Sequence, residues 1–400
     1  MKDRVLYLTY DGIMEPLGQS QVLCYLERLS QDRDIILISF EKSQDWQRVE
    51  QREIVRAQVR TAGITWIALR YHKRPSSLAT AYDIAQGLVV SVLGVMRYRI
   101  SIVHARSYVP SVIALALQKM FRLKFIFDMR GFWVDERIDG NLWSRGGTMY
   151  IVAKWFERRF LMNADHVVSL TRKAVQIMHS FDYLQGRLPP FTVIPTCADL
   201  TRFKPSMNHL TEDRPFVLGY VGTVGTWYKF DEVVACVVIL LRMKPNSKFL
   251  VINRNEHNYI RLRLQAAGVP ESSTEIITAS HAEVPALMAR MHAGIFFIKP
   301  AFSKQASAPT KLAEFLGCGI PCFGNADVGD MAEVLEAEQV GVAIKSFDEV
   351  SLQQGLEQLL NLCADPGISD RCVKAAHRHF SLDDGVARYQ AIYASLEING

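Results

Sequence analysis

Residues 307–321 read "SAPTKLAEFLGCGIP" and combine the signals of a short helix with polar side chains near its start. Pro309 suits the first turn of a helix, and Gly317 or Gly319 suits its end. Thr310 and Glu314 are four residues apart and therefore lie on one face of such a helix. The pattern predicts a helix of about two turns that brings a hydroxyl and a carboxylate toward the same side.

The start of this helix is suited to binding a phosphate. A helix N-terminus carries unpaired amides and the positive end of the helix dipole, and Ser307, Thr310 and Lys311 add two hydroxyls and a charge. Glu314 would repel a phosphate beside it, so one turn farther on it is suited to accept hydrogen bonds from ribose hydroxyls. The alternative is a surface helix with an ordinary Lys/Glu pair.

A second loop near the N-terminus offers a similar arrangement. Gly18, Gln19 and Ser20 follow the apolar run at residues 4–10 and precede an amphipathic segment. Ser20 alone is explained by capping a helix. Taken with the 307–321 segment, Gly18 and Gln19 become candidates for a second phosphate contact.

Composition and periodicity predict the elements that must position these residues. The 400-residue chain is 49% hydrophobic and 22% charged, which is typical of a globular protein with two domains. Apolar runs alternate with helix-length segments, and periodicity is lost between residues 193 and 216. We predict an α/β fold of two doubly wound domains facing each other across a cleft. The expected strands are residues 4–10, 34–40, 64–70, 100–106, 124–130 and 166–171, then 216–222, 248–253, 275–280, 293–299, 320–324 and 341–345.

Several common chemistries find no motif in the sequence. The pair Gly317 and Gly319 fails the GxGxxG fingerprint because Cys322 stands where the third glycine belongs. There is no GxxxxGK[ST], HExxH or GxSxG pattern. Seven cysteines without a CxxC pair favour a reducing compartment and offer no zinc site, so we expect no metal and no cofactor.

Charge is unevenly distributed along the chain. Residues 1–198 hold 27 Lys and Arg against 18 Asp and Glu, whereas residues 199–400 hold 19 against 23. A basic half favours contact with nucleic acid or an anionic membrane, and the alternative is a solvated basic face.

Two further segments bear on the location of the protein. The chain passes from a charged start straight into a strand, without the pattern of a signal peptide, so we expect it in the cytoplasm. The apolar stretch 84–96 is too short to cross a bilayer, which needs about 20 residues. We expect a buried helix there. With the basic run 70–75 and with Arg97 and Arg99, it also suggests a first domain that works against a membrane surface.

Three segments together resemble one family. Residues 307–322 resemble the nucleotide-sugar signature of family 4 retaining glycosyltransferases of the GT-B fold, residues 193–205 their domain junction, and residues 102–117 their first-domain strand and helix. The resemblance implies an acceptor-binding Rossmann-like domain at 1–198, a nucleotide-sugar-binding one at 199–380, and a helix at 381–400 that packs back on the first.

The resemblance also implies an activity. It implies transfer of a sugar, with retention of anomeric configuration, from a UDP- or GDP-sugar to a glycan or lipid-linked acceptor in bacterial cell-envelope or exopolysaccharide synthesis. Attack from the face that the diphosphate leaves requires no protein nucleophile, so the missing carboxylate pair is no argument against transfer.

The donor side departs from the family pattern. A basic residue usually follows the glycine after the second domain's first strand, but here Gly222 is followed by Thr223, and Lys229 is the nearest basic residue. Arg254 is a further candidate. We therefore expect Lys311 and Arg254 to hold the diphosphate, with Lys229 as the substitute.

The acceptor side departs as well. The family's histidine after a late first-domain strand is replaced by Arg130 within the segment 125–140. Asp128, Trp133 and Glu136 lie in the same segment. We expect Arg130 to support the departing phosphate and the other three to bind the acceptor, with structural ion pairs as the alternative.

Two other functions remain open at this stage. A nucleotide-sugar epimerase of the same architecture would use His104 and His281 for proton transfer, although isolated histidines are more often structural. A nucleic-acid-binding protein would use the basic half, which lacks the interleaved aromatic and basic residues that bind single strands. The resemblance favours glycosyl transfer and no nucleic-acid partner.

Overall fold

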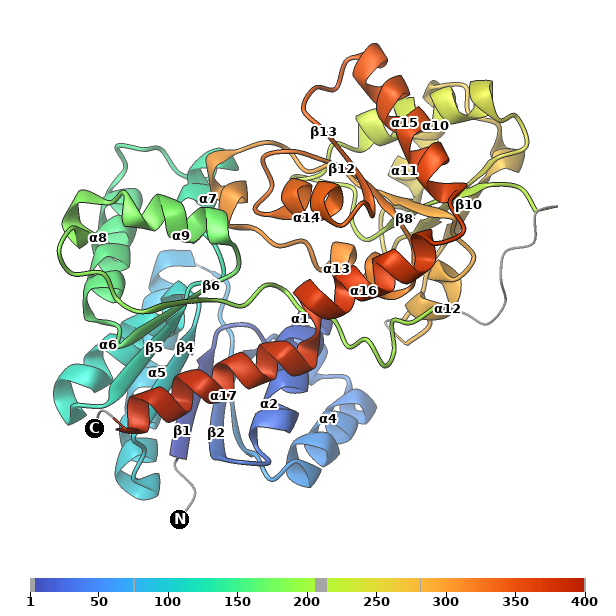
Figure 1. The fold of residues 1–400 in the computed structure, drawn as a ribbon. Coiled ribbons are helices and arrows are strands. Elements are labelled where there is room, and N and C mark those ends of the chain that lie inside the picture. Colours follow the sequence, from blue (N-terminus) through green and yellow to red (C-terminus); the bar gives the residue numbers. More distant parts are fainter. Residues whose placement is uncertain (1–3, 75, 206–213, 281, 399–400) are drawn as a thin grey trace. The chain divides into compact units, whose positions relative to one another are not determined.

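The computed structural model describes residues 4–74, 76–205, 214–280 and 282–398, in two compact units. Unit 1 comprises Met1–Pro195 and Leu382–Gly400, and unit 2 comprises Thr196–Ser381 (Figure 1). The predicted boundaries, after residues 198 and 380, lie within three residues of these limits. His281 lies outside the described residues.

Unit 1 is built on a parallel sheet of seven strands in the order β3-β2-β1-β4-β5-β6-β7. The first six strands match the six predicted runs. The seventh is short and follows two prolines, so it carried no apolar run that could predict it. Their bounds are β1 (Arg4–Thr9), β2 (Asp34–Glu41), β3 (Thr65–Arg70), β4 (Ile102–Arg106), β5 (Lys124–Asp128), β6 (His166–Ser169) and β7 (Phe191–Val193).

The helices of unit 1 fall on two faces of this sheet, because parallel crossovers are right-handed and the strand order reverses between β1 and β4. In one group α2 contacts α17, and in the other α6 contacts both α5 and α8. The helices are α1 (Pro16–Gly18), η1 (Gln19–Leu23), α2 (Cys24–Leu29), α3 (Ser43–Trp46), α4 (Val49–Thr61), α5 (Ser76–Tyr98), α6 (Tyr108–Phe121), α7 (Trp133–Asp139), α8 (Thr148–Asn163), α9 (Arg172–His179), η2 (Asp182–Leu184) and α17 (Leu382–Ile398).

Unit 2 repeats this architecture with six parallel strands in the order β10-β9-β8-β11-β12-β13, and all six correspond to predicted runs. The strands are β8 (Val217–Val221), β9 (Lys248–Ile252), β10 (Thr274–Ile277), β11 (Ala293–Ile295), β12 (Cys322–Asn325) and β13 (Gly341–Ile344). The helices are α10 (Phe230–Met243), α11 (His257–Ala266), η3 (Glu271–Ser273), α12 (Val284–Met288), η4 (Phe302–Ala306), α13 (Thr310–Gly317), α14 (Met331–Ala337), α15 (Glu349–Cys363) and α16 (Ile368–Phe380).

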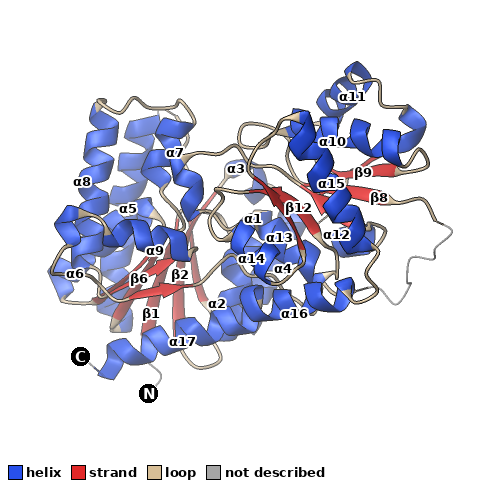
Figure 2. Cartoon of the chain, turned by 45° about the horizontal axis from the view of Figure 1, so that its top comes forward, coloured by secondary structure: helices blue, strands red, loops and turns tan. Residues whose placement is uncertain are grey.

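Both units therefore have the doubly wound, Rossmann-like fold that the sequence predicts. In Figure 2 the strands of each unit, in red, lie between layers of helices in blue. The order of strands reverses between β1 and β4 in unit 1 and between β8 and β11 in unit 2. In such sheets ligands bind beyond the carboxyl ends of the strands at the point of reversal, so these two places are where a site is expected.

Two predictions about local structure were wrong. Gly18 and Gln19 do not lie in a loop: they belong to a helical stretch that runs from Pro16 through α1, η1 and α2. Gly18 is buried, and a Cβ there would lie 2.0 Å from the carbonyl oxygen of Gly12. Close packing therefore explains this glycine without a phosphate.

The apolar stretch 84–96 belongs to a longer helix than predicted, and that helix is not buried. It spans Ser76–Tyr98, because the helix continues upstream of Asp83 through the uncharged residues 77–82. By length and composition α5 could cross a membrane, and it is one third buried. Its contacts with β1, β2 and α6 make it a covering helix of unit 1.

Candidate active site

The loop after β8 brings the backbone of Gly222 close to α13. Gly222 has a φ of 106°, in the left-handed region that favours glycine. Its N–H donates to the carbonyl of Ile252 and its own carbonyl accepts from the Asn253 side chain, both at 2.9 Å. A Cβ at this position would lie 3.3 Å from Lys311 Nζ. The glycine thus leaves room for the lysine ammonium against the backbone.

The same loop then places Tyr228 beside this lysine. The Lys229 N–H donates to Phe297 at 3.0 Å, and the Lys299 N–H donates to Trp227 at 2.8 Å. These hydrogen bonds tie the loop to the chain that follows β11. They hold the Tyr228 ring with its centroid 3.9 Å from Lys311 Nζ.

Lys311, in the first turn of α13, is a buried cation with no hydrogen-bond partner in the described part of the chain. Only 8% of the residue is exposed. The rings of Tyr228, Tyr220 and Phe296 surround the ammonium at 3.9, 4.9 and 5.4 Å, and cation–π attraction compensates only partly for lost water. Burial therefore lowers the pKa of Lys311 to about 7, although Glu314 opposes this shift.

Glu314 lies one turn farther along α13 and is also buried. Burial raises the pKa of Glu314 to about 7, and the charges of Lys311 and Arg202 oppose this shift. The alternative of a surface helix with an ordinary ion pair is therefore wrong: both side chains are buried, and no residue in the described ranges forms a hydrogen bond with the ammonium. The pair can take up or release protons near neutral pH and can accept a charged, hydrogen-bonding ligand.

The point of reversal in unit 1 holds a different kind of charge cluster. Asp128, at the end of β5, is fully buried and accepts a hydrogen bond from Tyr389 of α17 at 3.0 Å. Arg106 and Arg130 each place a guanidinium nitrogen 3.8 Å from its carboxylate, and His104 Nε2 lies at 3.7 Å. Burial alone would raise the pKa of Asp128, but Arg130, His104 and Arg106 outweigh it and hold that pKa below its usual value.

Two protein-family models match the chain, one in the first half and one in the second. Residues 22–196 match the family model of the glycosyl transferase 4-like domain, and residues 203–379 match that of glycosyl transferases group 1. The chain belongs to the group 1, family 4-like glycosyltransferases. No curated protein matches it by sequence. The matched models assign glycosyl transfer rather than epimerisation or nucleic-acid binding.

Solved structures of low sequence identity share the fold of this glycosyltransferase. Sucrose-phosphate synthase from Thermosynechococcus elongatus has a TM-score of 0.73 at 13% identity, with 100% of both chains covered. Anabaena HepE in complex with UDP has a TM-score of 0.71 at 12% identity, covering 98% of this chain and 100% of that one. A glycosyltransferase from Rickettsia africae has a TM-score of 0.72 at 13% identity, with 100% of both chains covered. The fold is that of GT-B enzymes.

Among the predicted donor residues, the structure brings Gly222, Lys311 and Glu314 together and leaves Ser307 and Thr310 half-buried at the start of α13. The others lie differently. Thr223 is exposed, and its carbonyl accepts from the Tyr220 hydroxyl. Lys229 pairs with Glu232 and lies 4.6 Å from the centroid of the Phe347 ring. Arg254 is exposed beyond β9. Gly18 and Gln19 belong to unit 1.

Asp128 and Arg130, two residues of the predicted acceptor segment, form an ion pair at 3.8 Å, whereas Trp133 packs among other aromatic side chains. The Trp133 ring lies 5.5 Å from Tyr108 and 5.4 Å from Trp143, and the guanidinium of Arg137 lies 4.8 Å from it. Glu136 is half-buried in α7. Arg130 has a φ of 55° and is followed by Gly131 with a φ of 118°. Such strained backbone is typical of functional loops.

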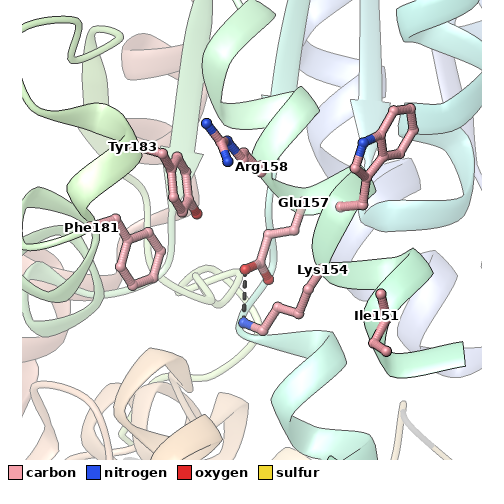
Figure 3. A pocket seen from close by; sticks show the side chains of 7 residues that line it. Ile151, Lys154, Glu157, Arg158, Phe181 and Tyr183 are labelled. Atoms are coloured by element: carbon pink, nitrogen blue, oxygen red, sulfur yellow. Dashed lines mark hydrogen bonds and ion pairs between the residues drawn. The ribbon is translucent and has the colours of Figure 1, made fainter. Parts of the chain in front are cut away.

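Structural ion pairs explain one further acid of the 125–140 segment. Lys154 Nζ donates to Asp135 at 2.6 Å and to Glu157 at 2.8 Å. Figure 3 shows Lys154 and Glu157 of α8 joined in this way, with Phe181 and Tyr183 on the opposite side of a cavity of about 390 Å³. Burial raises the pKa of Glu157, and Lys154 opposes this shift. The charges here are matched within the protein.

Sequence reasoning missed several residues of these sites, among them Tyr228 and Arg106. Tyr228 was overlooked because nothing in the sequence shows that its loop is tied back over Lys311. Arg106 could have been chosen as a site residue from its position. It ends a predicted strand that lies next to the reversal of strand order, where an arginine can face a ligand. Within the described ranges, no group of three or more His, Cys, Asp or Glu could hold a metal ion, and all seven cysteines are free thiols.

Proposed function

We propose that this glycosyltransferase moves a sugar from a nucleotide-sugar donor to a glycan or lipid-linked acceptor, with retention of anomeric configuration. We further propose that it serves bacterial cell-envelope or exopolysaccharide synthesis at the inner face of the cell membrane. One observation carries the donor half of this proposal: a buried ammonium at the point of strand reversal in unit 2 that has no hydrogen-bond partner among the residues that the structure describes.

In unit 2 the diphosphate binds to Lys311. A buried cation without a partner is relieved of its desolvation cost when an anion arrives, so the site is preorganised for a phosphate. The amides at the start of α13, with Ser307 and Thr310, supply hydrogen bonds, and Arg254 adds a second cation. Glu314 accepts from the ribose hydroxyls.

The donor is a UDP- or GDP-sugar. HepE from Anabaena, which shares the fold, has been solved with UDP and with UDP-glucose. Both nucleotides present the same diphosphate and the same ribose diol to Lys311 and Glu314. The loop at 222–230 lies beside this site and is therefore where the base and the sugar are distinguished.

The reaction breaks the bond between the anomeric carbon and the diphosphate oxygen. Negative charge grows on the leaving diphosphate and positive charge on the sugar ring, so Lys311 stabilises the transition state more than the bound donor. The acceptor hydroxyl attacks from the face that the diphosphate leaves. Its oxygen bonds to the anomeric carbon, and its proton passes to the departing phosphate oxygen. No protein nucleophile takes part.

Unit 1 binds the acceptor. Asp128, Trp133 and Glu136 are the proposed acceptor residues, with Arg130 as the cation that supports the departing phosphate. Arg130 keeps 11% of its side chain exposed, whereas only 1% of the Asp128 side chain is. This difference in exposure supports a role for Arg130 in contacting the ligand and for Asp128 in orienting Arg130.

Calorimetry with UDP-, GDP-, ADP- and CDP-sugars tests the proposal. We expect one base class to bind, and we expect the same donor to support transfer to an isolated envelope glycan or lipid fraction. Product analysis by NMR should then show the anomeric configuration of the donor. Absence of binding by every nucleotide sugar, or an inverted product, would contradict it.

A further inference from the structure

The outward face of α5 carries large apolar side chains along its whole length. They recur at intervals of three, four and seven residues, so they form one stripe along the helix. Each is more than half exposed. The residues are Leu78, Tyr82, Val89, Leu93 and Met96.

The inward face of α5 carries small or polar side chains instead. Every fourth residue from Ala79 to Val95 is buried, and Gly87 lies at the centre of this row. A Cβ on Gly87 would lie 2.7 Å from Ile113 of α6. The helix therefore packs closely through small residues and turns its bulky apolar side chains outward. A covering helix of a globular domain normally does the reverse, so this face is built for a partner.

The charges around the stripe have one sign. Asp83 is the only acidic residue between positions 54 and 127 of the sequence, and it points inward. Its carboxylate accepts from the Tyr10 hydroxyl at 2.7 Å and from the His72 amide at 3.0 Å. Exposed basic residues lie at both ends of the helix: Lys73, Arg74, Arg97 and Arg99.

The start of α8 continues this surface. Ser77 Oγ of α5 lies 4.0 Å from Met149 Sδ of α8, which joins the two helices at their first turns. The first two turns of α8 expose further apolar side chains, including an indole: Met149, Ile151, Val152 and Trp155. The exposed charged residues between positions 140 and 163 are all arginines: Arg145, Arg158 and Arg159. The exposed apolar side chains of these two helices, together with the basic residues beside them, are here called the α5–α8 surface.

We propose that the α5–α8 surface docks unit 1 on an anionic lipid bilayer. Apolar side chains enter the interface, the Trp155 ring lies at headgroup level, and the flanking cations bind anionic headgroups. The helix lies on the membrane and does not span it, because α5 is held against β1, β2 and α6. This inference rests on the proposed function, to which it adds the surface that contacts the lipid.

A second copy of the chain is a poorer occupant of this surface. In a symmetric dimer the same patch meets itself, so the basic residues at the ends of α5 and along α8 would face like charges. An anionic bilayer instead supplies the opposite charge along the whole edge. It also accepts a long apolar stripe without requiring a complementary shape.

Flotation with vesicles tests the proposal, using the full chain and vesicles of phosphatidylcholine alone or with about one third phosphatidylglycerol. The test variant carries Val89→Gln and Leu93→Gln. The matched control carries Leu262→Gln and Val350→Gln in unit 2, which remove apolar side chains of similar exposure. All four substitutions lie on helix surfaces, so folding should persist, and thermal unfolding checks it.

We expect wild type and control to float with the anionic vesicles, less so at high salt and much less with neutral vesicles. The Val89→Gln/Leu93→Gln variant should bind about tenfold or more weakly. Donor binding by calorimetry should be the same in all three proteins, which separates this test from that of the proposed function. Equal binding by test and control variants, or no flotation of wild type, would overturn the proposal. The proposal would also be overturned if wild type were a dimer in solution and the Val89→Gln/Leu93→Gln variant were a monomer.

Discussion

Two lysines, half-buried Lys154 in unit 1 and buried Lys311 in unit 2, show opposite relations to their surroundings. Lys154 of α8 donates to both Asp135 and Glu157, and although burial alone would lower its pKa, the two carboxylates outweigh burial and raise it. Lys311 of α13 has no hydrogen-bond partner in the described part of the chain, and burial lowers its pKa to about 7. Both lie on helices that cover a parallel sheet, so the fold alone does not explain the difference.

The difference separates a structural charge from a functional one. A buried cation matched by acids contributes to a single folded arrangement, and removing it leaves those acids without a counterion. A buried cation without a hydrogen bond destabilises the unliganded protein, and its retention is explained when a ligand supplies the missing anion. Stability and activity should therefore respond in opposite ways at the two positions.

The largest effect on stability is expected at Lys154. Lys154→Met should lower the free energy of unfolding by about 3 kcal/mol, because the buried Glu157 carboxylate loses its counterion. The loss should shrink as the pH falls: the pKa of Glu157 is already raised, rises further in the variant, and a protonated carboxyl needs no cation. Urea unfolding at pH 5 and at pH 8 measures both. A variant as stable as wild type at pH 8 would mean that the pair is not structural.

At Lys311 the expectation is reversed. Lys311→Met should slow turnover by roughly 10²- to 10³-fold, since the charge it offsets grows in the transition state. Stability should stay the same or increase, because the variant removes a buried ammonium to which no described residue is hydrogen-bonded. Glu314, whose pKa is about 7, can take up a proton when the charge of Lys311 is lost. Transfer assays and urea unfolding of the same preparation test this. Full activity, or a protein much less stable than wild type, would make Lys311 another structural charge.

A smaller effect is expected at Glu314. Glu314→Gln keeps the shape of the side chain and should weaken donor binding by about 1.5 to 3 kcal/mol, the contribution of a charge-assisted hydrogen bond to the ribose. Calorimetry with a nucleotide sugar and with its 2′-deoxyribose analogue sharpens the test. If Glu314 contacts the ribose, the analogue should lose less affinity on substitution than the parent donor does. Equal losses would place Glu314 away from the ribose.

The elements of this fold could be predicted because apolar runs of strand length are a local signal. Twelve of its strands match runs visible in the sequence, and the missed β7 has three residues after two prolines. The short helix at 310–317 was visible from Pro309 before it and from two candidate glycines at its end, Gly317 and Gly319. Gly18 misled because a glycine before a helix suggests a phosphate loop, whereas here it packs against Gly12.

The surroundings of the predicted side chains could not be read in the same way. Lys311 and Glu314 were chosen from their types and spacing, but burial and the Tyr228 ring come from backbone hydrogen bonds between distant segments. Likewise, the sequence around Asp128 does not predict its contact with Tyr389, which belongs to α17 at the other end of the chain. Burial of α5 was expected from its apolar composition, yet only packing reveals which face is turned outward.

Proton uptake on donor binding tests the central claim most directly, namely that Lys311 receives the diphosphate. At pH 8 Lys311 is mostly neutral before binding, and the diphosphate requires it charged. Of the groups around it, Glu314 is already mostly ionised at this pH, and burial raises the pKa values of Tyr220 and Tyr228 so that both stay neutral. A nucleotide sugar is the right probe, since it lacks the terminal phosphate that titrates near pH 6. Calorimetry in buffers of different ionisation enthalpy should show that wild type takes up about one proton per donor bound and that Lys311→Met takes up none. The affinity of wild type for the donor should also fall up to about tenfold for each pH unit above neutral. No uptake by wild type, or the same uptake by both proteins, would contradict the account.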